Sequence, residues 1–309
     1  MPDAASALSD PMTDLASLDH IRALPCFTGK IDIEPLTGGL SNENWLVKDA
    51  TGRHVVRLGK DFPFHHVDRK REIMTARAAH AAGFAPRVEY FEPGIMVSEF
   101  IEARTFDAAD VRANPKRIGR LIRDFHTTMP RHIEGPGFMF WVFHVIRDYA
   151  RTLTSGGSRM VDRLPAWLDL SDSLEAAQCP LPIIFGHNDL LPANFLDDGH
   201  KLWLIDFEYA GFSTAMFDIA GAASNAEMTE TEAATLVEAA LGQAPDIALT
   251  RSFHAMQCAS LLRETLWSLV SELHLDAPGA DYRTYTAENL ARLDAALEQY
   301  HSTYGKTSS

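Results

Sequence analysis

The hydrophobic pattern of this sequence changes near residue 100, and that change limits the folds open to the chain. Before it, short apolar runs are joined by turn residues, as in 44–48 and 54–58 on either side of Asp49–Gly52, a pattern typical of β-hairpins. After it, apolar residues recur every three or four positions, which predicts amphipathic helices. The sequence therefore predicts an α+β protein of two lobes, a β-rich lobe over residues 1–101 and a mainly helical lobe over 102–309.

Individual elements can be assigned within this outline. In the first lobe, segment 67–82 is rich in helix formers, with Asp68 near its start and Gly83 just after it. The first twenty residues carry no comparable signal, and we expect them to be loose. Further strands are expected at 88–91 and 95–98, helices at 118–125, 143–152, 230–242, 248–274 and 286–300, and short strands at 183–185, 194–196 and 202–205.

Composition excludes several classes of protein. With 309 residues, 46% of them hydrophobic, the chain can bury a sizeable core, so a disordered or disulfide-scaffolded protein is excluded. The net charge of −14 argues against binding to nucleic acid or to an anionic membrane. The longest apolar run, Gly137–Ile146, is about half the length of a bilayer span, which argues against stable membrane insertion. The three cysteines form no CxxC pair, which favours a reducing compartment. We expect a cytoplasmic protein that is a monomer or a homodimer.

Charge is unevenly distributed along the chain. Residues 51–87 contain eight basic and three acidic side chains, whereas the rest of the chain is strongly acidic. This basic segment is either an ordinary solvated face or part of a lobe that holds phosphate groups.

Two acidic segments near the middle of the chain suggest a chemistry. Asp189 precedes Asn194 by five residues, and Asp206 and Glu208 follow a predicted turn at Asp198–Gly199. In phosphoryl transfer, one carboxylate orients or deprotonates the attacking hydroxyl, while an Asn and a second Asp hold magnesium. Magnesium takes oxygen ligands, so Asn194, Asp206 and Glu208 are chemically suitable. The alternative is that Asp189 and Asp206 are only turn residues beside buried strands.

These segments resemble the choline/ethanolamine kinase family, within the wider aminoglycoside-phosphotransferase and protein-kinase-like fold. The resemblance is carried by His187–Asn194, Leu204–Tyr209 and Phe217–Ala220, and it extends from about Leu36 to Tyr285. It implies a two-lobed kinase that uses ATP and Mg²⁺ to phosphorylate a small cationic alcohol. By the same analogy Asp189 is the catalytic base, and Asn194 and Asp206 are magnesium ligands, with Glu208 assisting.

The resemblance also assigns nucleotide-binding residues in the first lobe. Leu36–Asn44 stands where kinases place a glycine-rich loop, and although it is not G-x-G-x-x-G, Ser41 and Asn42 offer polar contacts to phosphate. Arg57 takes the strand position at which protein kinases use Lys, and Glu72 on the next helix would pair with it. An ordinary surface salt bridge would explain the same two residues.

The segment Val97–Ile101 matches the hinge of the family, where backbone groups meet the adenine. Glu99 and Ile101 are assigned to this hinge only from their position in the segment, because the end of an ordinary apolar strand would have the same sequence pattern.

The acceptor site is predicted from a late helix. Arg263–Val270 resembles the family's helix whose Trp packs on the choline headgroup, so Trp267 and Tyr285 are candidates for a pocket wall near Asp189. Glu264 stands where some relatives have a second Trp, and its charge also suits a primary amine. Asn225 falls at a further family-like position. The competing interpretation is that the aromatic side chains belong to the core.

Two other functions remain open at this point. The acceptor could be an aminoglycoside, thiamine or another amino alcohol, or the chain could be a catalytically silent pseudokinase that only binds nucleotide. The adjacent His65 and His66 do not share a helix face and have no suitably spaced acids, so they do not predict a metal site.

Overall fold

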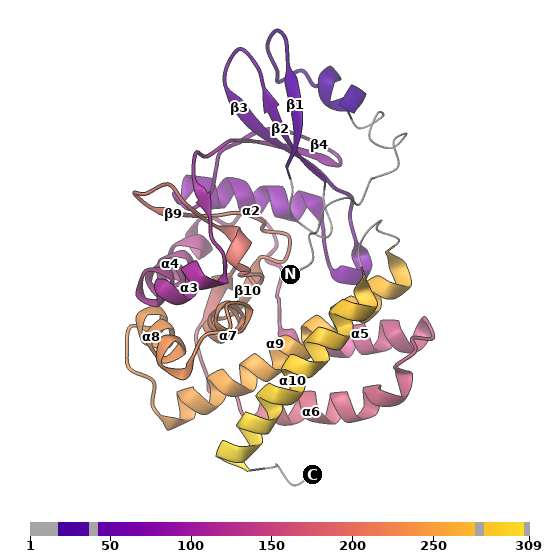
Figure 1. The fold of residues 1–309 in the computed structure, drawn as a ribbon, viewed down its shortest axis with the longest axis vertical. Helices are drawn as coiled ribbons and strands as arrows, with labels where there is room; N and C mark the ends of the chain where they lie inside the picture. Colours follow the sequence, from indigo (N-terminus) through magenta and orange to yellow (C-terminus); the bar gives the residue numbers. More distant parts are fainter. Residues whose placement is uncertain (1–17, 37–42, 276–280, 306–309) are drawn as a thin grey trace.

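The computed structural model describes residues 18–36, 43–275 and 281–305, and it has an upper β-rich lobe and a lower helical lobe (Figure 1). The upper lobe is a five-stranded antiparallel sheet in the order β1-β2-β3-β5-β4. Its strands are β1 (Asp32–Leu36), β2 (Glu43–Lys48), β3 (Arg53–Leu58), β4 (Val88–Glu92) and β5 (Ile95–Glu99). The predicted two-lobed α+β fold and the two predicted hairpins are confirmed.

The helix α2 (Arg69–Ala81) crosses beneath this sheet (Figure 1). It begins where the Asp68 side chain accepts a hydrogen bond from the Arg71 amide at 3.0 Å. It ends before Gly83, whose φ of +85° is left-handed backbone that glycine adopts without strain. Both ends lie where the sequence predicts them, so the local signals are sufficient for this element.

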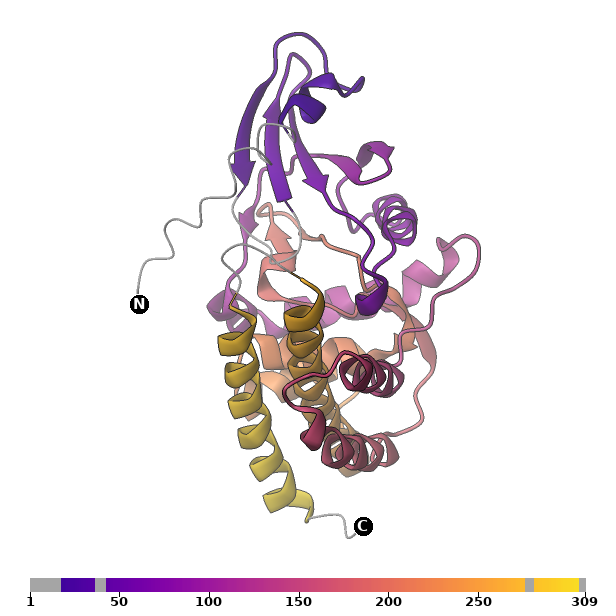
Figure 2. The same cartoon turned by 90° about the vertical axis from the view of Figure 1, so that its right-hand side faces the viewer.

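The lower lobe is organised around one long buried helix, α9 (Ile247–His274), beside which α10 (Tyr282–Tyr304) lies in both views (Figures 1 and 2). The five predicted helical segments are confirmed. The helices over 108–113, 164–176 and 215–225 were not predicted. In the last of these, the run of Ala, Gly and apolar residues has no polar face to reveal a period. The other helices are α3 (Ala108–Ala113), α4 (Pro115–Thr128), α5 (Val142–Ser155), α6 (Leu164–Ala176), α7 (Ala215–Asn225) and α8 (Glu230–Leu241), with 3₁₀ turns η1 (Pro63–His65), η2 (Met129–Arg131), η3 (Val161–Arg163) and η4 (Pro192–Asn194).

Short strands in the lower lobe carry the acidic segments. The strand β7 (Ile183–Gly186) pairs with β10 (Gly211–Thr214), which the sequence did not predict. The strands β8 (Phe195–Asp197) and β9 (Leu202–Leu204) form a hairpin, and β6 (Arg104–Thr105) adds to its edge. From β7 the chain passes through η4 into the β8–β9 hairpin, and it then returns as β10, which pairs with β7.

The hydrophobic core has two parts. A small cluster that includes Trp45, Val47 and Val97 lies within the upper lobe. The larger cluster fills the lower lobe and includes Ala76 and Ala79 of α2. Because α2 contributes to the larger cluster, it joins the two lobes. The predicted domain boundary at residue 101 stays a prediction. In the part of the chain that the structure describes, no helix is both long and apolar enough to cross a membrane.

Candidate active site

The loop that carries Asp189 is held rigidly at the end of β7. Asn188 has a left-handed φ of +60°, and its side-chain amide donates to the carbonyls of Tyr209 at 3.1 Å and Gly211 at 3.3 Å. A Cβ at position 186 would lie 2.8 Å from the Asn188 Oδ1, so a larger residue there would displace the Asn188 side chain. These contacts fix the backbone immediately before Asp189.

The buried carboxylate of Asp218 stabilises the same loop from α7. It accepts hydrogen bonds from the amides of His187 at 2.8 Å and Asn188 at 2.6 Å, and it lies 2.7 Å from the His126 Nε2. Burial acts to raise the pKa of Asp218, but the hydrogen bond and charge of His126 and the hydrogen bond from the His187 amide outweigh it, so the pKa lies below its usual value. Asp218 is therefore an ionised anchor for the loop.

Hydrogen bonds join the two acidic segments. The Asn194 side chain donates to the Asp189 carbonyl at 2.8 Å, and the Ile205 amide donates to the Asn194 carbonyl at 3.2 Å. The His187 ring lies 2.9 Å from the Ile205 carbonyl, and burial lowers the pKa of this histidine, which favours a neutral ring that donates from Nε2. Asp206 follows with a left-handed φ of +70°. The structure thus brings the Asp189–Asn194 loop against the segment that carries Asp206.

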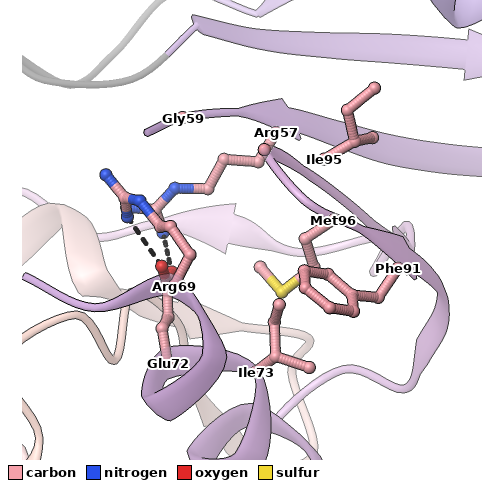
Figure 3. A pocket seen from close by; sticks show the side chains of 9 residues that line it. Arg57, Gly59, Arg69, Glu72, Ile73, Phe91, Ile95 and Met96 are labelled. Atoms are coloured by element: carbon pink, nitrogen blue, oxygen red, sulfur yellow. Dashed lines mark hydrogen bonds and ion pairs between the residues drawn. The ribbon is translucent and has the colours of Figure 1, made fainter. Parts of the chain in front are cut away.

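A network of buried charges connects these acids to the upper lobe. The Arg57 guanidinium lies 2.7 Å from Glu72 Oε1, 2.9 Å from Asp206 Oδ1 and 3.0 Å from Glu208 Oε2. Arg69 reaches Glu72 at 2.6 Å and Glu208 at 3.0 Å. Figure 3 shows both arginines directed at Glu72. Arg57 is 9% exposed and Glu72 only 2%, so the surface salt bridge considered as an alternative is wrong.

Charge and burial both act on Asp189. Burial raises the pKa of Asp189 well above its usual range, the nearby Arg263 opposes this, and the negative charges of Asp206, Glu264 and Glu208 add to it. A raised pKa makes the ionised form of a carboxylate a stronger base. The environment of Asp189 therefore suits a general base.

The predicted nucleotide contacts are only partly described. Ser41 and Asn42 lie outside the described residues. Glu99 ends β5, where its amide donates to the Arg87 carbonyl at 2.9 Å and its side chain accepts from the Arg87 amide at 3.0 Å. Ile101 follows the strand and is partly buried. Both residues lie at the junction of the lobes, and their contact with adenine stays a prediction.

A small hollow borders Asp189 on the side of α9. Its walls include Asn225, Glu264 and Arg263, and its volume including the mouth is about 380 Å³. The Asn225 side chain donates to the Leu190 carbonyl at 3.3 Å, while Glu264 accepts a hydrogen bond from the Tyr285 hydroxyl at 2.7 Å. The structure therefore places Asn225 and Glu264 beside Asp189, with Tyr285 bonded to Glu264.

Trp267 lies among aromatic side chains of the lower lobe. It is 7% exposed, its indole N–H donates to the Tyr209 hydroxyl at 2.9 Å, and the His65 ring stacks on it at 5.0 Å with an interplanar angle of 21°. The Tyr282 and Tyr285 rings meet it edge-on at 6.2 and 6.1 Å. Trp267 is therefore packed into the aromatic core, and its contact and that of Tyr285 with an acceptor stay predictions.

His65 comes from the 3₁₀ turn η1, which reaches from the upper lobe to α9. Its Nε2 lies 2.8 Å from the Ser271 hydroxyl and its Nδ1 lies 3.2 Å from the Tyr149 hydroxyl. Burial lowers the pKa of His65 to about 2, and the charges of Arg263, His66 and His274 act in the same direction. A neutral His65 thus ties the upper lobe to the aromatic cluster of the lower lobe.

The pH dependence of stability tests this role of His65. An unfolded histidine takes up a proton near pH 6.5, whereas His65 in the folded chain does not, so the unfolded state binds more protons as the pH falls below 6.5. We expect the wild type to lose about 1.2 kcal/mol more unfolding free energy than His65→Gln between pH 6 and pH 5. Urea titrations at each pH measure this difference, and parallel pH profiles for the two proteins would contradict it.

Several residues of the site were missed by the sequence analysis. Arg69 precedes Glu72 by three residues on one helix, a spacing that could have indicated their pairing. His65 gave no signal, because its partners lie 84 and 206 residues away. The anchoring role of Asp218 and His126 depends on a contact between two helices and was equally hidden.

The metal-binding potential of the site depends on few side chains. No cluster of three or more His, Cys, Asp or Glu side chains suited to a metal occurs among the residues the structure describes. Magnesium in nucleotide enzymes is usually held by one or two protein carboxylates together with phosphate and water oxygens. The Asp206 side chain is 28% exposed and its Oδ1 already faces the positive charge of Arg57. Asn194 and Asp206 therefore fit magnesium held jointly with a nucleotide.

The sheet lobe, the helical lobe, and the acidic segments at their junction define a member of the protein-kinase-like class of folds. Within this class, the model of the choline/ethanolamine kinase family matches residues 33–239, and the chain belongs to that family.

Individual relatives agree with this assignment. The Arabidopsis thaliana protein named "Probable ethanolamine kinase" is 31% identical over 209 residues, which are 60% of this chain and 54%, about half, of that relative. The solved structure of a choline/ethanolamine kinase family protein from Mesorhizobium loti is 28% identical, with a TM-score of 0.72 over 93% of this chain and 95% of the other. Spectinomycin phosphotransferase, solved with ADP and spectinomycin, shares the fold at 13% identity, with a TM-score of 0.59 over 86% of this chain and 93% of that one.

Proposed function

We propose that this protein transfers a phosphoryl group from ATP to the hydroxyl of a small amino alcohol of the choline or ethanolamine type, in the presence of Mg²⁺. The observation that carries this proposal is the joining of the Asp189 loop to the segment of Asp206 through His187, Asn194 and Ile205. The two segments supply the base and the metal ligands that phosphoryl transfer needs.

The roles of the residues follow from their surroundings. Asp189 accepts the proton of the acceptor hydroxyl, and burial supports this role because it raises the pKa of the carboxylate. Asn194 and Asp206 would hold Mg²⁺, with Glu208 behind them, and the bound ion would neutralise charge on the phosphates. Arg57 keeps its positive charge at every cellular pH and is tied to Glu72, so it places a cation beside Asp206.

ATP as the phosphoryl donor is supported by the family and by the fold. Spectinomycin phosphotransferase, which shares the fold, was solved with ADP. In this chain Ser41, Asn42, Arg57, Glu72, Glu99 and Ile101 are proposed to contact the nucleotide or to position the groups that do.

The charge of the hollow favours an amino alcohol. Glu264 lines it beside Asp189, and a carboxylate suits the ammonium group of such an acceptor.

Release of ADP across a panel of acceptors tests the proposal. We expect Mg²⁺- and acceptor-dependent ADP release with at least one of choline, ethanolamine, homoserine and thiamine, above the rate with water alone. If only kanamycin gave turnover, the proposed acceptor class would be wrong and the proposed phosphotransferase activity would stand. If Mg–ATP raised the melting temperature while no acceptor gave ADP, the chain would be a silent nucleotide-binding protein and the proposal would be wrong.

A further inference from the structure

The turn η1 is part of a short loop that reaches from the upper lobe to the lower lobe. The amides of Phe62 and Val67 each donate to the carbonyl of the other at 3.1 Å, so the loop is closed at its base. At its tip, the Phe64 ring stacks on His274 of α9 at 4.7 Å with an interplanar angle of 22°, and His65 beside it is 2% exposed. The loop is therefore a compact unit whose tip packs against α9.

His65 holds one face of the Trp267 indole. The two rings stack at 5.0 Å, and both nitrogens of the imidazole have hydroxyl partners, Ser271 at 2.8 Å and Tyr149 at 3.2 Å. These two contacts fix the orientation of the imidazole ring. The edge of the indole is fixed separately, because its N–H donates to the Tyr209 hydroxyl. Trp267 is thus held on one face by the upper lobe and at its edge by the lower lobe.

Trp267 in turn supports the carboxylate that is proposed to bind the ammonium group of the acceptor. The Tyr285 ring meets the indole edge-on at 6.1 Å, and the Tyr285 hydroxyl donates to Glu264 Oε1 at 2.7 Å. Glu264 and Asp189 both line the hollow. Because protein interiors are close-packed, a shift of the indole would move Tyr285 and with it Glu264. An acceptor whose hydroxyl and ammonium groups are only two carbons apart leaves little tolerance for such a shift.

From these contacts we propose that His65 is a positioning residue for the acceptor: it holds Trp267, and through it the Glu264 carboxylate, in the place that acceptor binding requires. The inference rests on the proposed phosphotransferase function, and it gives the lobe of the proposed nucleotide contacts a part in acceptor recognition. His65 acts by packing and not by charge, since burial lowers its pKa to about 2 and leaves the ring neutral.

Two substitutions separate the flat ring of His65 from its hydrogen bonds. His65→Phe keeps a ring that can stack on Trp267, whereas His65→Leu lacks it, and both variants lose the contacts to Ser271 and Tyr149. In steady-state ADP release with Mg–ATP, we expect His65→Leu to raise KM for the better of choline and ethanolamine roughly 10- to 100-fold, the cost of a misplaced binding group. His65→Phe should keep a KM for the acceptor close to that of the wild type, and KM for Mg–ATP should stay unchanged in both variants. A merely structural role would lower the melting temperature without this selective change in KM.

Phe64→Leu is the matched control, because Phe64 lies in the same turn but contacts α9 at His274, about two helical turns beyond Trp267. It should leave KM for the acceptor unchanged. Equal KM values for His65→Leu and His65→Phe, or an equal rise in Phe64→Leu, would overturn the inference, while turnover by the wild type would keep the proposed function standing. No ADP release by the wild type with any acceptor would remove both. If His65→Leu does not fold, His65→Gln, which also lacks the aromatic ring, replaces it in the comparison.

Discussion

Replacing Asp189 with asparagine is expected to lower kcat by about 10²- to 10⁴-fold, the usual contribution of a general base. The amide has almost the same shape, and it cannot take the proton from the acceptor hydroxyl. The loop should keep its structure, because Asn188, Asp218 and Gly186 hold its backbone independently of the Asp189 carboxylate. Steady-state ADP release with saturating Mg–ATP and the best acceptor measures the effect.

The pH profile of the wild type provides a second readout of Asp189. Only the ionised carboxylate can accept a proton, and burial raises its pKa, so kcat/KM should fall as the pH decreases through that raised value and should reach a plateau above it. Asp124→Asn is the matched control, since Asp124 has a 64% exposed side chain on α4. Near-wild-type turnover in Asp189→Asn would remove Asp189 from the mechanism.

The parts of the structure that were predictable depend on contacts close in sequence. The helix α2 could be placed because Asp68 and Gly83 act on neighbouring backbone groups. The meeting of Asn194 with the segment of Asp206 was equally accessible, because only a short hairpin separates them. Short loops leave few ways to arrange such segments, so spacing and residue type were informative.

The parts that were not predictable depend on contacts between distant segments. The Arg57 pair with Glu72 was expected by analogy, but its burial with Arg69 and Glu208 required the packing of the upper lobe on the lower. The contact of Trp267 with a ligand stays a prediction, and the stacking of His65 on its ring could not be foreseen from the sequence. A helical pattern of aromatic residues is the same for a core and for a pocket wall, so the sequence could not separate these outcomes.

Replacing Arg57 with methionine is expected to lower the free energy of unfolding by about 3–5 kcal/mol, the cost of removing one partner from a buried ion pair. Methionine keeps much of the side-chain volume, but it leaves Glu72, Asp206 and Glu208 with less positive charge beside them. Arg69 still pairs with Glu72 and Glu208. Urea denaturation at constant pH measures the loss. The same variant should lose most phosphotransferase activity, because Arg57 links the upper lobe to Asp206.

Arg53→Met is the matched control on the same strand. Arg53 has a 42% exposed side chain and pairs with Glu102, so its replacement should cost no more than about 1 kcal/mol. Adding Glu72→Gln to Arg57→Met should restore part of the lost stability, because it removes a carboxylate left without its cation, and the two changes should be non-additive by about 0.5–3 kcal/mol. Two outcomes would contradict this role of Arg57. One is an equal loss of unfolding free energy in Arg57→Met and Arg53→Met, and the other is strict additivity of Arg57→Met with Glu72→Gln.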